Sequence, residues 1–309
     1  MSFSVYLPIA GNAVNVFLLL GLGGLVGFLS GLFGVGGGFL MTPLLIMIGV
    51  PATIAAASDS NQIVAASTSG TYAHARAGSV DFKMGGLLLV GGLVGGSLGV
   101  LLIRLLRKAG EANFAITVTY VLMLGGIGSY MFFESLQGLR GGRRPPREGS
   151  EERPSALARL VGALPFRLHF ARSNVTFSVL IPLFFGLVVG VLAAVMGVGG
   201  GFIMVPVMVY LLRMPMHVVV GTSLFQILAT CINVTILQAA VNHTVDPVLA
   251  LILLVGSVIG AQLGARFSKR LHADQLKILM SVIVLAVMLK MLLGLLIRPD
   301  ILLSYGGGH

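Results

Sequence analysis

Two polar patches interrupt apolar stretches of this 309-residue chain, and they contain the side chains best suited to chemistry. The first is Ser58-Asp-Ser-Asn-Gln62, and the second carries Thr222, Ser223 and Gln226. Hydroxyl and amide groups can donate hydrogen bonds to an anion, and the Asp59 carboxyl group can carry a proton. Polar groups at membrane depth normally face a cavity or another helix, and an ionisable one there suggests function. These patches are therefore candidate binding residues.

Each patch follows a glycine-rich segment. Gly34-Val-Gly-Gly-Gly-Phe-Leu-Met-Thr-Pro43 matches Gly197-Val-Gly-Gly-Gly-Phe-Ile-Met-Val-Pro206 at eight of ten positions. Glycine permits unusual backbone angles and close approach of a ligand to the main chain. A short helix that begins there would aim unpaired N–H groups and its dipole at an anion. The alternative interpretation is a tight helix crossing or a plain kink.

The predicted site combines these features, with Asp59 as the proton-coupling residue. The candidate substrate-binding residues are Gly36, Gly37, Gly38, Ser58, Asn61, Gln62, Gly199, Gly200, Gly201, Thr222, Ser223 and Gln226. Ser and Thr often only bond helix backbones across a packed interface, which is the competing role for the hydroxyl groups. Asp59 has its own alternative, as a cap near a membrane surface.

Other chemistries find little support. One cysteine, Cys231, excludes an intramolecular disulfide, and six scattered His residues suggest no metal cluster of usual spacing. No Lys-Ser or Lys-Thr pair follows the glycines, so a phosphate-binding P-loop is not indicated. Asp59 is the single carboxyl group within the predicted spans. We therefore expect no metal, no cofactor and no enzyme activity.

The composition is that of an integral membrane protein. Hydrophobic residues make up 56% of the chain and charged residues 10%, with a mean hydropathy of +1.01, whereas soluble domains carry about 25% charged residues. The formal charge of +10 comes mostly from loops, where cations orient helices. The charge therefore does not indicate a nucleic-acid partner, and the expected surroundings are membrane lipid.

The expected fold is an all-α polytopic membrane protein of about eight spans, since a span needs about 20 apolar residues. Two further apolar runs, Phe39 to Ile48 and Phe202 to Leu212, are too short to cross and are expected to be re-entrant half-helices. The predicted spans are 12–33, 52–72, 85–105, 114–133, 177–197, 217–240, 247–267 and 278–297.

A tandem duplication organises the chain. Residues 1–133 form the first membrane repeat, 134–172 an Arg-rich linker, and 173–309 the second repeat. The linker is expected to be solvated, although 155–171 could form an amphipathic surface helix. Glycines recur every four residues in both halves, a pattern that lets helices pack closely. They are Gly91, Gly95 and Gly99, with partners Gly256, Gly260 and Gly264.

The basic loops predict an orientation. Arg104, Arg107 and Lys108 correspond to Arg266, Lys269 and Arg270, and the positive-inside rule places both loops in the cytoplasm. Four spans per half then give parallel repeats, with the termini and the linker outside. In the alternative, inverted arrangement, each half-helix would cross as a fifth span.

With its two copies of G-x-G-G-G-F-[LI]-M-x-P, each followed by a polar Ser/Thr-to-Gln helix, the chain resembles the sulfite exporter TauE/SafE family. The likeness covers about 10–133 and 175–297. It implies a proton-coupled transporter of sulfite or organic sulfonates, in the inner membrane of a bacterial cell. The glycine-rich starts of the two half-helices predict anion binding independently of this resemblance. Open alternatives are a structural or assembly subunit, or a transporter of an unrelated small anion. A homo-oligomer is also compatible with the sequence.

Overall fold

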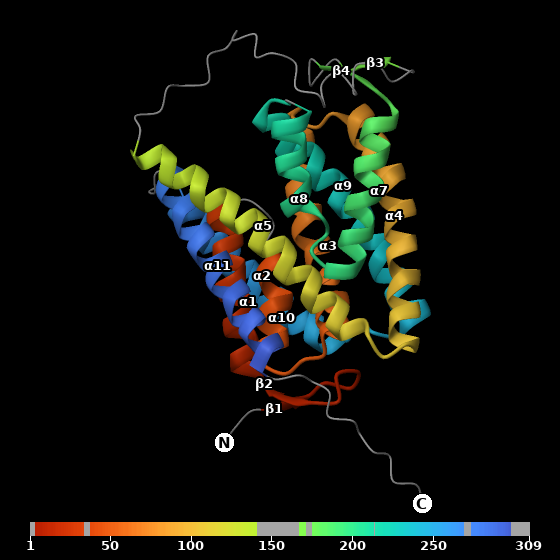
Figure 1. The fold of residues 1–309 in the computed structure, drawn as a ribbon, viewed down its shortest axis with the longest axis vertical. Coiled ribbons are helices and arrows are strands. Elements are labelled where there is room, and N and C mark those ends of the chain that lie inside the picture. The colour runs from red at the N-terminus through yellow and green to blue at the C-terminus, as the bar shows by residue number, and fades with distance from the viewer. Residues whose placement is uncertain are drawn as a thin grey trace, which may run out of the picture.

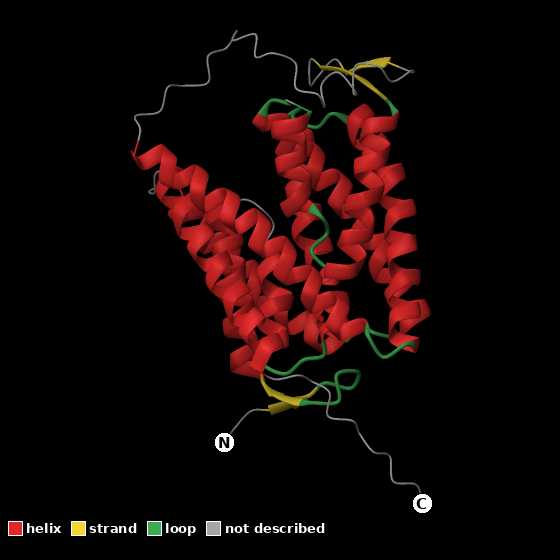
Figure 2. Ribbon diagram, viewed as in Figure 1, coloured by secondary structure: helices red, strands yellow, loops and turns green. Residues whose placement is uncertain are grey.

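The computed structural model describes residues 4–33, 38–140, 167–170, 175–212, 214–268 and 273–297, and most of them form a helical bundle (Figures 1 and 2). The first half contains β1 (Ser4–Tyr6), β2 (Ala13–Asn15), α1 (Val16–Phe33), α2 (Gly38–Met47), α3 (Ala52–Arg76), α4 (Phe82–Lys108) and α5 (Ala112–Arg140). The second half contains β3 (Arg167–Phe170), β4 (Val175–Ser178), α7 (Leu180–Met196), α8 (Gly201–Pro206), the π-helix η1 (Val207–Leu211), α9 (Met216–Leu237), the π-helix η2 (Gln238–Asn242), α10 (Pro247–Ser268) and α11 (Ala273–Ile297).

A helix occupies each of the eight predicted spans, and α2 and α8 with η1 occupy the two predicted half-helices. Five helical segments in the described residues are long and apolar enough to cross a membrane. They are Phe82–Lys108, Ala112–Phe133, Val218–Asn242, Pro247–Gly264 and Ile278–Leu296. Helices α1, α2 and α7 are shorter, and α3 carries the first polar patch. Length and composition therefore support five spans among the described residues, and the predicted count of eight stays a prediction.

Two small antiparallel hairpins depart from the all-α expectation. β1 pairs with β2 next to the start of α1, and β3 pairs with β4 next to the start of α7. The strand β3 lies within 155–171, where an amphipathic helix was the alternative; 155–166 and 171 lie outside the described residues. The described bundle itself is helical, because the spans satisfy their backbone groups internally.

The main helix pairs join the two halves. α1 packs on α10, α4 on α7, α3 on α9, and α5 on α11. The predicted glycine patterns lie at the first two contacts. A Cβ at Gly95 of α4 would be 2.0 Å from the Leu187 carbonyl oxygen of α7, and one at Gly260 of α10 would be 2.0 Å from the Gly24 oxygen of α1. The predicted packing role is confirmed for five of these glycines, Gly91, Gly95, Gly99, Gly256 and Gly260.

We expect Gly95→Ala to destabilise the protein, because the added methyl group meets the backbone of a neighbouring helix. Overpacking of this kind costs about 1 to 3 kcal/mol. Gly86→Ala is the matched control on the same helix, since nothing lies within 4 Å of a Cβ there. Thermal unfolding in detergent should show a lower melting temperature for Gly95→Ala alone. Equal melting temperatures for the two variants would contradict the close packing of α4 and α7.

The repeats are inverted, and the parallel arrangement predicted from the loops is wrong. The equivalent helices α3 and α9 run antiparallel, because Gly70 lies near Leu224 while His74 lies near Gly221. Similarly, α5 meets α11 with Gly128 near Val284. Antiparallel contact between equivalent elements is the mark of an inverted-topology repeat, related by an axis in the membrane plane.

The prediction of parallel repeats was wrong because an inverted fold does not need each half-helix to cross the membrane as a fifth span. Instead, α1 and α2 leave and return at the same end of the bundle, where the Asn12 side chain donates to the Gly49 carbonyl group (3.0 Å). In the second half, Ile181 at the start of α7 and Leu212 after η1 share one apolar cluster. Each half thus begins with two helices whose outer ends lie close together, and α3, α4 and α5, or α9, α10 and α11, follow.

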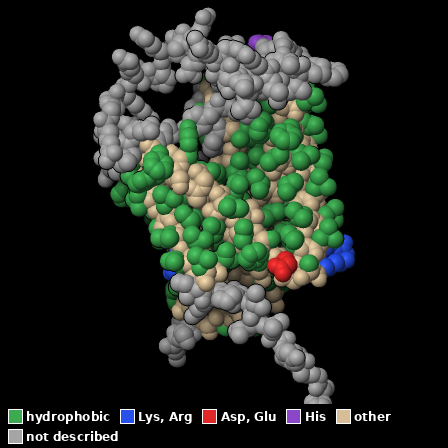
Figure 3. Space-filling model, in the orientation of Figure 1, with side chains coloured by type: hydrophobic (Ala, Val, Ile, Leu, Met, Phe, Trp, Pro, Cys, Tyr) green, Lys and Arg blue, Asp and Glu red, His purple; other side chains and the backbone are tan. Residues whose placement is uncertain are grey.

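The two basic loops consequently lie at opposite ends, and not on one side as predicted. α4 ends beside η2, where Arg107 donates to the Asn242 carbonyl oxygen, and α10 begins nearby and ends at Ser268 at the other end. α5 ends and β3 begins at this second end (Figure 1). Between the ends, the visible face is covered by hydrophobic side chains (Figure 3).

Candidate functional site

The two glycine motifs meet at the centre of the bundle. Phe39, near the start of α2, and its equivalent Phe202, near the start of α8, stack with ring centroids 4.5 Å apart and an interplanar angle of 9°. Both rings are buried. The contact joins identical positions of the two repeats, so it lies on their approximate two-fold axis. The starts of the two half-helices are thereby brought together, as the motif predicted.

The second glycine motif requires left-handed backbone angles. The φ angles of Gly197, Gly199 and Gly200 are 74°, 69° and 79°, which other residues rarely adopt. The backbone role predicted for these glycines is confirmed in this copy. In the first copy, Gly38 begins α2, while Gly36 and Gly37 lie outside the described residues.

The described glycines are also tightly enclosed by protein. A Cβ at Gly38 would be 2.3 Å from the Ile63 side chain, and one at Gly200 would be 2.2 Å from that of Val189. A Cβ at Gly199 would meet Cys231 and Ile227 within 2.8 Å. Packing is therefore sufficient to explain these three positions, and Gly201 follows as the first residue of α8. Substrate contact at any of them stays a prediction.

Asp59 is fully buried beside the start of α2. One carboxylate oxygen, Oδ2, accepts from the Thr42 hydroxyl group (2.9 Å), and a Cβ at Gly38 would be 3.3 Å from it. The other oxygen, Oδ1, is buried without a hydrogen-bond partner. Asp59 lies about 10 Å along α3 at 1.5 Å per residue, so it is not a cap in the first turn of this helix. Its proton-coupling role stays a prediction.

A polar chain connects Asp59 with the second glycine motif. Close to Thr42, the Tyr120 hydroxyl group donates to the carbonyl oxygen of Met196 at the end of α7. The next carbonyl, that of Gly197, accepts from Ser60 (3.3 Å). The first repeat therefore fixes the backbone at which α7 turns into α8.

Sequence reasoning missed Thr42 and Tyr120, although signals existed. Thr42 occupies one of the two positions at which the motifs differ, and Val205 is its equivalent. Asp59 likewise corresponds to Ser223. A polar residue at a variable motif position beside a single buried acid could have indicated this one-sided network. Tyr120 is a phenol within an apolar span, and such groups usually find a partner when buried.

Gln62 and Gln226 occupy equivalent, buried positions on α3 and α9. The Gln62 amide nitrogen donates to the Ser257 hydroxyl group of α10, and the Gln226 nitrogen to Thr230 (3.0 Å) within α9. Both amide oxygens are buried without a partner. Rotation of an amide exchanges its oxygen and nitrogen, so each side chain has one polar atom available to a ligand, as acceptor or donor. The two glutamines face different helices, α10 and α4.

Ser58 and Thr222 have structural contacts that the sequence did not suggest. The Ser58 hydroxyl group accepts from the backbone N–H of Asp246, just before α10 (3.1 Å), and Thr222 accepts from that of Asp81, just before α4 (3.0 Å). These two contacts are equivalent and each joins the two halves. They locate both hydroxyl groups at helix starts, which matches the competing packing role.

The remaining predicted residues, Ser223 and Asn61, make no hydrogen bond to the described residues of the glycine motifs or to Asp59. Ser223 is buried and its hydroxyl group donates to the Val220 carbonyl oxygen of its own helix (3.1 Å). Asn61 is half-buried on α3. The structure therefore gathers Gly38, Asp59 and the second glycine motif around one centre, with the two glutamines one residue away from Ile63 and Ile227 of that centre.

Helix pairs that turn back within inverted repeats, with a buried acid and unpartnered polar atoms beside them, are typical of integral membrane transporters. Comparison with known proteins gives the family: the chain matches "Sulfite exporter TauE/SafE" over residues 19–291, and it belongs to that family. It is 28% identical over 278 residues to "Probable membrane transporter protein YjnA" of Bacillus subtilis, covering 89% of this chain and 98% of that protein.

Two further relatives support the assignment. A "Probable membrane transporter protein" of Xylella fastidiosa (strain 9a5c) is 28% identical over 84% of this chain and 88% of its own length. "Probable membrane transporter protein YunE" of Bacillus subtilis is 23% identical over 87% of this chain and 94% of its own length. No solved structure matched the chain significantly.

Proposed function

We propose that the protein transports a small sulfur oxyanion or organosulfonate and that protons are coupled to this movement through Asp59. The substrate class comes from the family description. The single observation that carries the site is the convergence of both glycine motifs on a fully buried Asp59 with an unpartnered oxygen. The membrane of a bacterial cell is the proposed location.

The amides at the half-helix starts supply the proposed anion contacts, with the glutamines beside them. The first N–H groups of a helix have no partner within it, and the helix dipole favours negative charge there. Paired half-helices of inverted repeats are where secondary transporters hold their substrates. Access from either side then alternates as the repeats move about the central Phe39–Phe202 contact.

A transporter of an unrelated small anion would use the same site, and so it stays the alternative substrate. A structural or assembly subunit is the less favoured alternative, because packing needs neither a buried unpaired carboxylate oxygen nor unpartnered amides. Such groups cost free energy when they are buried. Their presence at equivalent or central positions supports a ligand.

Distribution of charge suggests the orientation. Most Lys and Arg residues lie in the sequence segments between α5 and α7 and between α10 and α11, and the described ends of these helices share one end of the bundle. Under the positive-inside rule, we place this end in the cytoplasm and the two termini outside. In this orientation the linker is cytoplasmic, whereas parallel repeats would place it outside the cell.

Tyr120→Phe should reduce proton coupling more than protein abundance. The variant keeps the aromatic packing but loses the hydrogen bond to the Met196 carbonyl oxygen and the contact with Thr42. A hydrogen bond of this kind contributes about 1 kcal/mol to stability. Proton uptake per transported anion, followed with a pH-sensitive dye in proteoliposomes, should fall. The matched control is Tyr130→Phe on the same helix, where the side chain is exposed. A wild-type ratio in Tyr120→Phe would contradict a role in coupling.

The deciding experiment for the function is transport in proteoliposomes. Purified full-length protein is reconstituted, and uptake and efflux of labelled sulfite, sulfate, thiosulfate and a small sulfonate are measured with and without a pH gradient. Stimulation of sulfite or sulfonate movement by the gradient is the expected result. Transport of a different anion alone would replace the substrate, and no transport of any anion would favour the structural subunit.

A further inference from the structure

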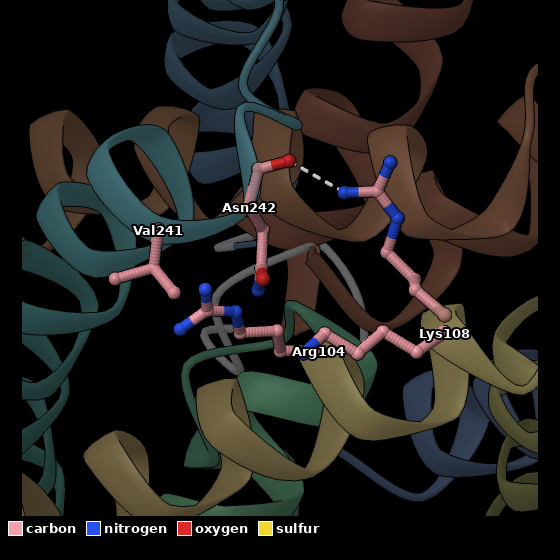
Figure 4. Close-up of a pocket in the computed structure, with 5 residues that line it drawn as sticks. Arg104, Lys108, Val241 and Asn242 are labelled. Carbon is pink, nitrogen blue, oxygen red and sulfur yellow. Dashed lines mark hydrogen bonds between the residues drawn. The ribbon is translucent and has the colours of Figure 1, made fainter.

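An open pocket of about 260 Å³ lies where α4 ends against η2, away from the central site. It is lined by Arg104, Arg107, Lys108, Val241 and Asn242. Figure 4 shows the Arg104 side chain extending from α4 toward Val241 and Asn242, with Lys108 one turn further along the helix. The three cations are three and four residues apart, so they share one face of α4. No acidic residue lines the pocket.

The wall opposite α4 is held rigidly. Arg107 donates to the Asn242 carbonyl oxygen, and the Asn242 side chain donates to Gln238 (2.6 Å) and to the Val100 carbonyl oxygen (3.3 Å). Thr244 donates to the same Gln238 oxygen (3.2 Å). All three of these polar side chains are buried. Arg107 therefore uses one of its N–H groups to bind the backbone of η2. Arg104 and Lys108 are exposed and face the pocket.

Exposed apolar side chains lie on the same part of α4 as the cations of the pocket. Leu101 and Leu105 of α4 are 48% and 64% exposed, and they lie within one turn of Arg104. The cations thus sit where the apolar outer surface of α4 ends. In a helix that crosses a membrane, the end of the apolar surface is where lipid headgroups are expected, with acyl chains along the apolar side chains.

We propose that this pocket binds the phosphate of an anionic lipid, with Arg104 and Lys108 as its charged ligands and Leu101 and Leu105 in contact with its acyl chains. Basic pockets between membrane helices take such headgroups on the cytoplasmic side, and this pocket would do so in the outer leaflet, since the end of α4 lies opposite the end proposed to be cytoplasmic. The apolar border favours a lipid over a free oxyanion, which would need no leucines. The proposal is independent of the transported substrate.

The test uses native mass spectrometry of the full-length protein with added phosphatidylglycerol or phosphatidylcholine. Wild type should retain phosphatidylglycerol selectively. The double variant Arg104→Gln/Lys108→Gln should bind it on the order of 10- to 30-fold more weakly. Lys83→Gln is the control, because it removes an exposed cation at the other end of α4. Equal retention of the anionic lipid by wild type and the double variant would overturn the proposal.

A second arm separates lipid from free oxyanion. Sulfite or inorganic phosphate is added at millimolar concentration to the complex with phosphatidylglycerol. Retention of the lipid supports the proposal. Displacement of the lipid from wild type, together with weaker sulfite binding by the double variant, would assign the pocket to free anions and overturn it. Melting temperatures of all variants, measured in detergent, exclude unfolding as the cause of lost binding.

Discussion

Asp59→Asn is expected to slow transport about 100-fold and to flatten its dependence on pH, because Asn cannot take up or release a proton. The side chains are almost the same size, and Asn can still accept from the Thr42 hydroxyl group, so folding should be preserved. Initial rates in proteoliposomes between pH 5 and pH 8 would measure the effect. This range is chosen because sulfite also titrates there.

Proton coupling affects the direction in which the anion can be driven across the membrane. An anion leaves a cell with the inside-negative potential, whereas entry costs about 2.3 kcal/mol per charge per 100 mV. A proton carried by Asp59 would offset that cost. Ser223→Ala at the equivalent position of the second repeat is the control, and it should leave the pH dependence unchanged. An Asn variant with the rate and pH dependence of the wild type would assign Asp59 to structure and leave the proton on the substrate.

Gln62→Ala and Gln226→Ala are each expected to weaken substrate binding about 10- to 100-fold, which is the cost of a lost hydrogen bond to a charged group, about 1.5 to 3 kcal/mol. Both residues have an unpartnered amide oxygen in equivalent places, so similar effects are expected. The concentration of sulfite at half-maximal transport would measure them.

Two control variants distinguish the ligand from the scaffold. Ser257→Ala removes the protein partner of Gln62, and Thr230→Val removes that of Gln226, while both keep the amides. These controls should leave affinity within a few-fold of the wild type. If the alanine variants bind sulfite as the wild type does, the glutamines serve packing alone.

The helices were predictable because apolar length and punctuating glycines report them locally. Gly38 and Gly201 begin the half-helices within a residue of their predicted starts at Phe39 and Phe202. The relative direction of the repeats was not predictable in this way. It depends on whether the chain turns back near 34–37 and after Gly197, and apolar composition is the same in either case. The basic loops therefore led to a wrong prediction, because Arg104, Arg107 and Lys108 lie at the opposite end of the bundle from Arg266, their equivalent in the second repeat.

The site was predictable in its types and less so in its contacts. Asp59 and the two glutamines are buried and partly unpartnered, in line with a polar patch at membrane depth. Ser58 and Thr222 instead contact helix starts of the other half. Nothing local distinguishes a hydroxyl group that contacts a distant backbone from one that contacts a ligand. The Tyr120 contact with Met196 was equally hidden, because it joins residues from different halves.

The exchange of α1 and α7 between the halves determines when the protein can assemble. During synthesis the glycine-lined side of α1, which approaches the backbone of α10 at Ser257, must wait for almost the whole chain to be made. α4 likewise waits for α7. Such contacts between distant parts of a chain form late and slow folding. Cutting the chain within the linker therefore leaves two fragments that each lack the partners of their four main helix pairs, and the fragments must associate before either can reach its native packing.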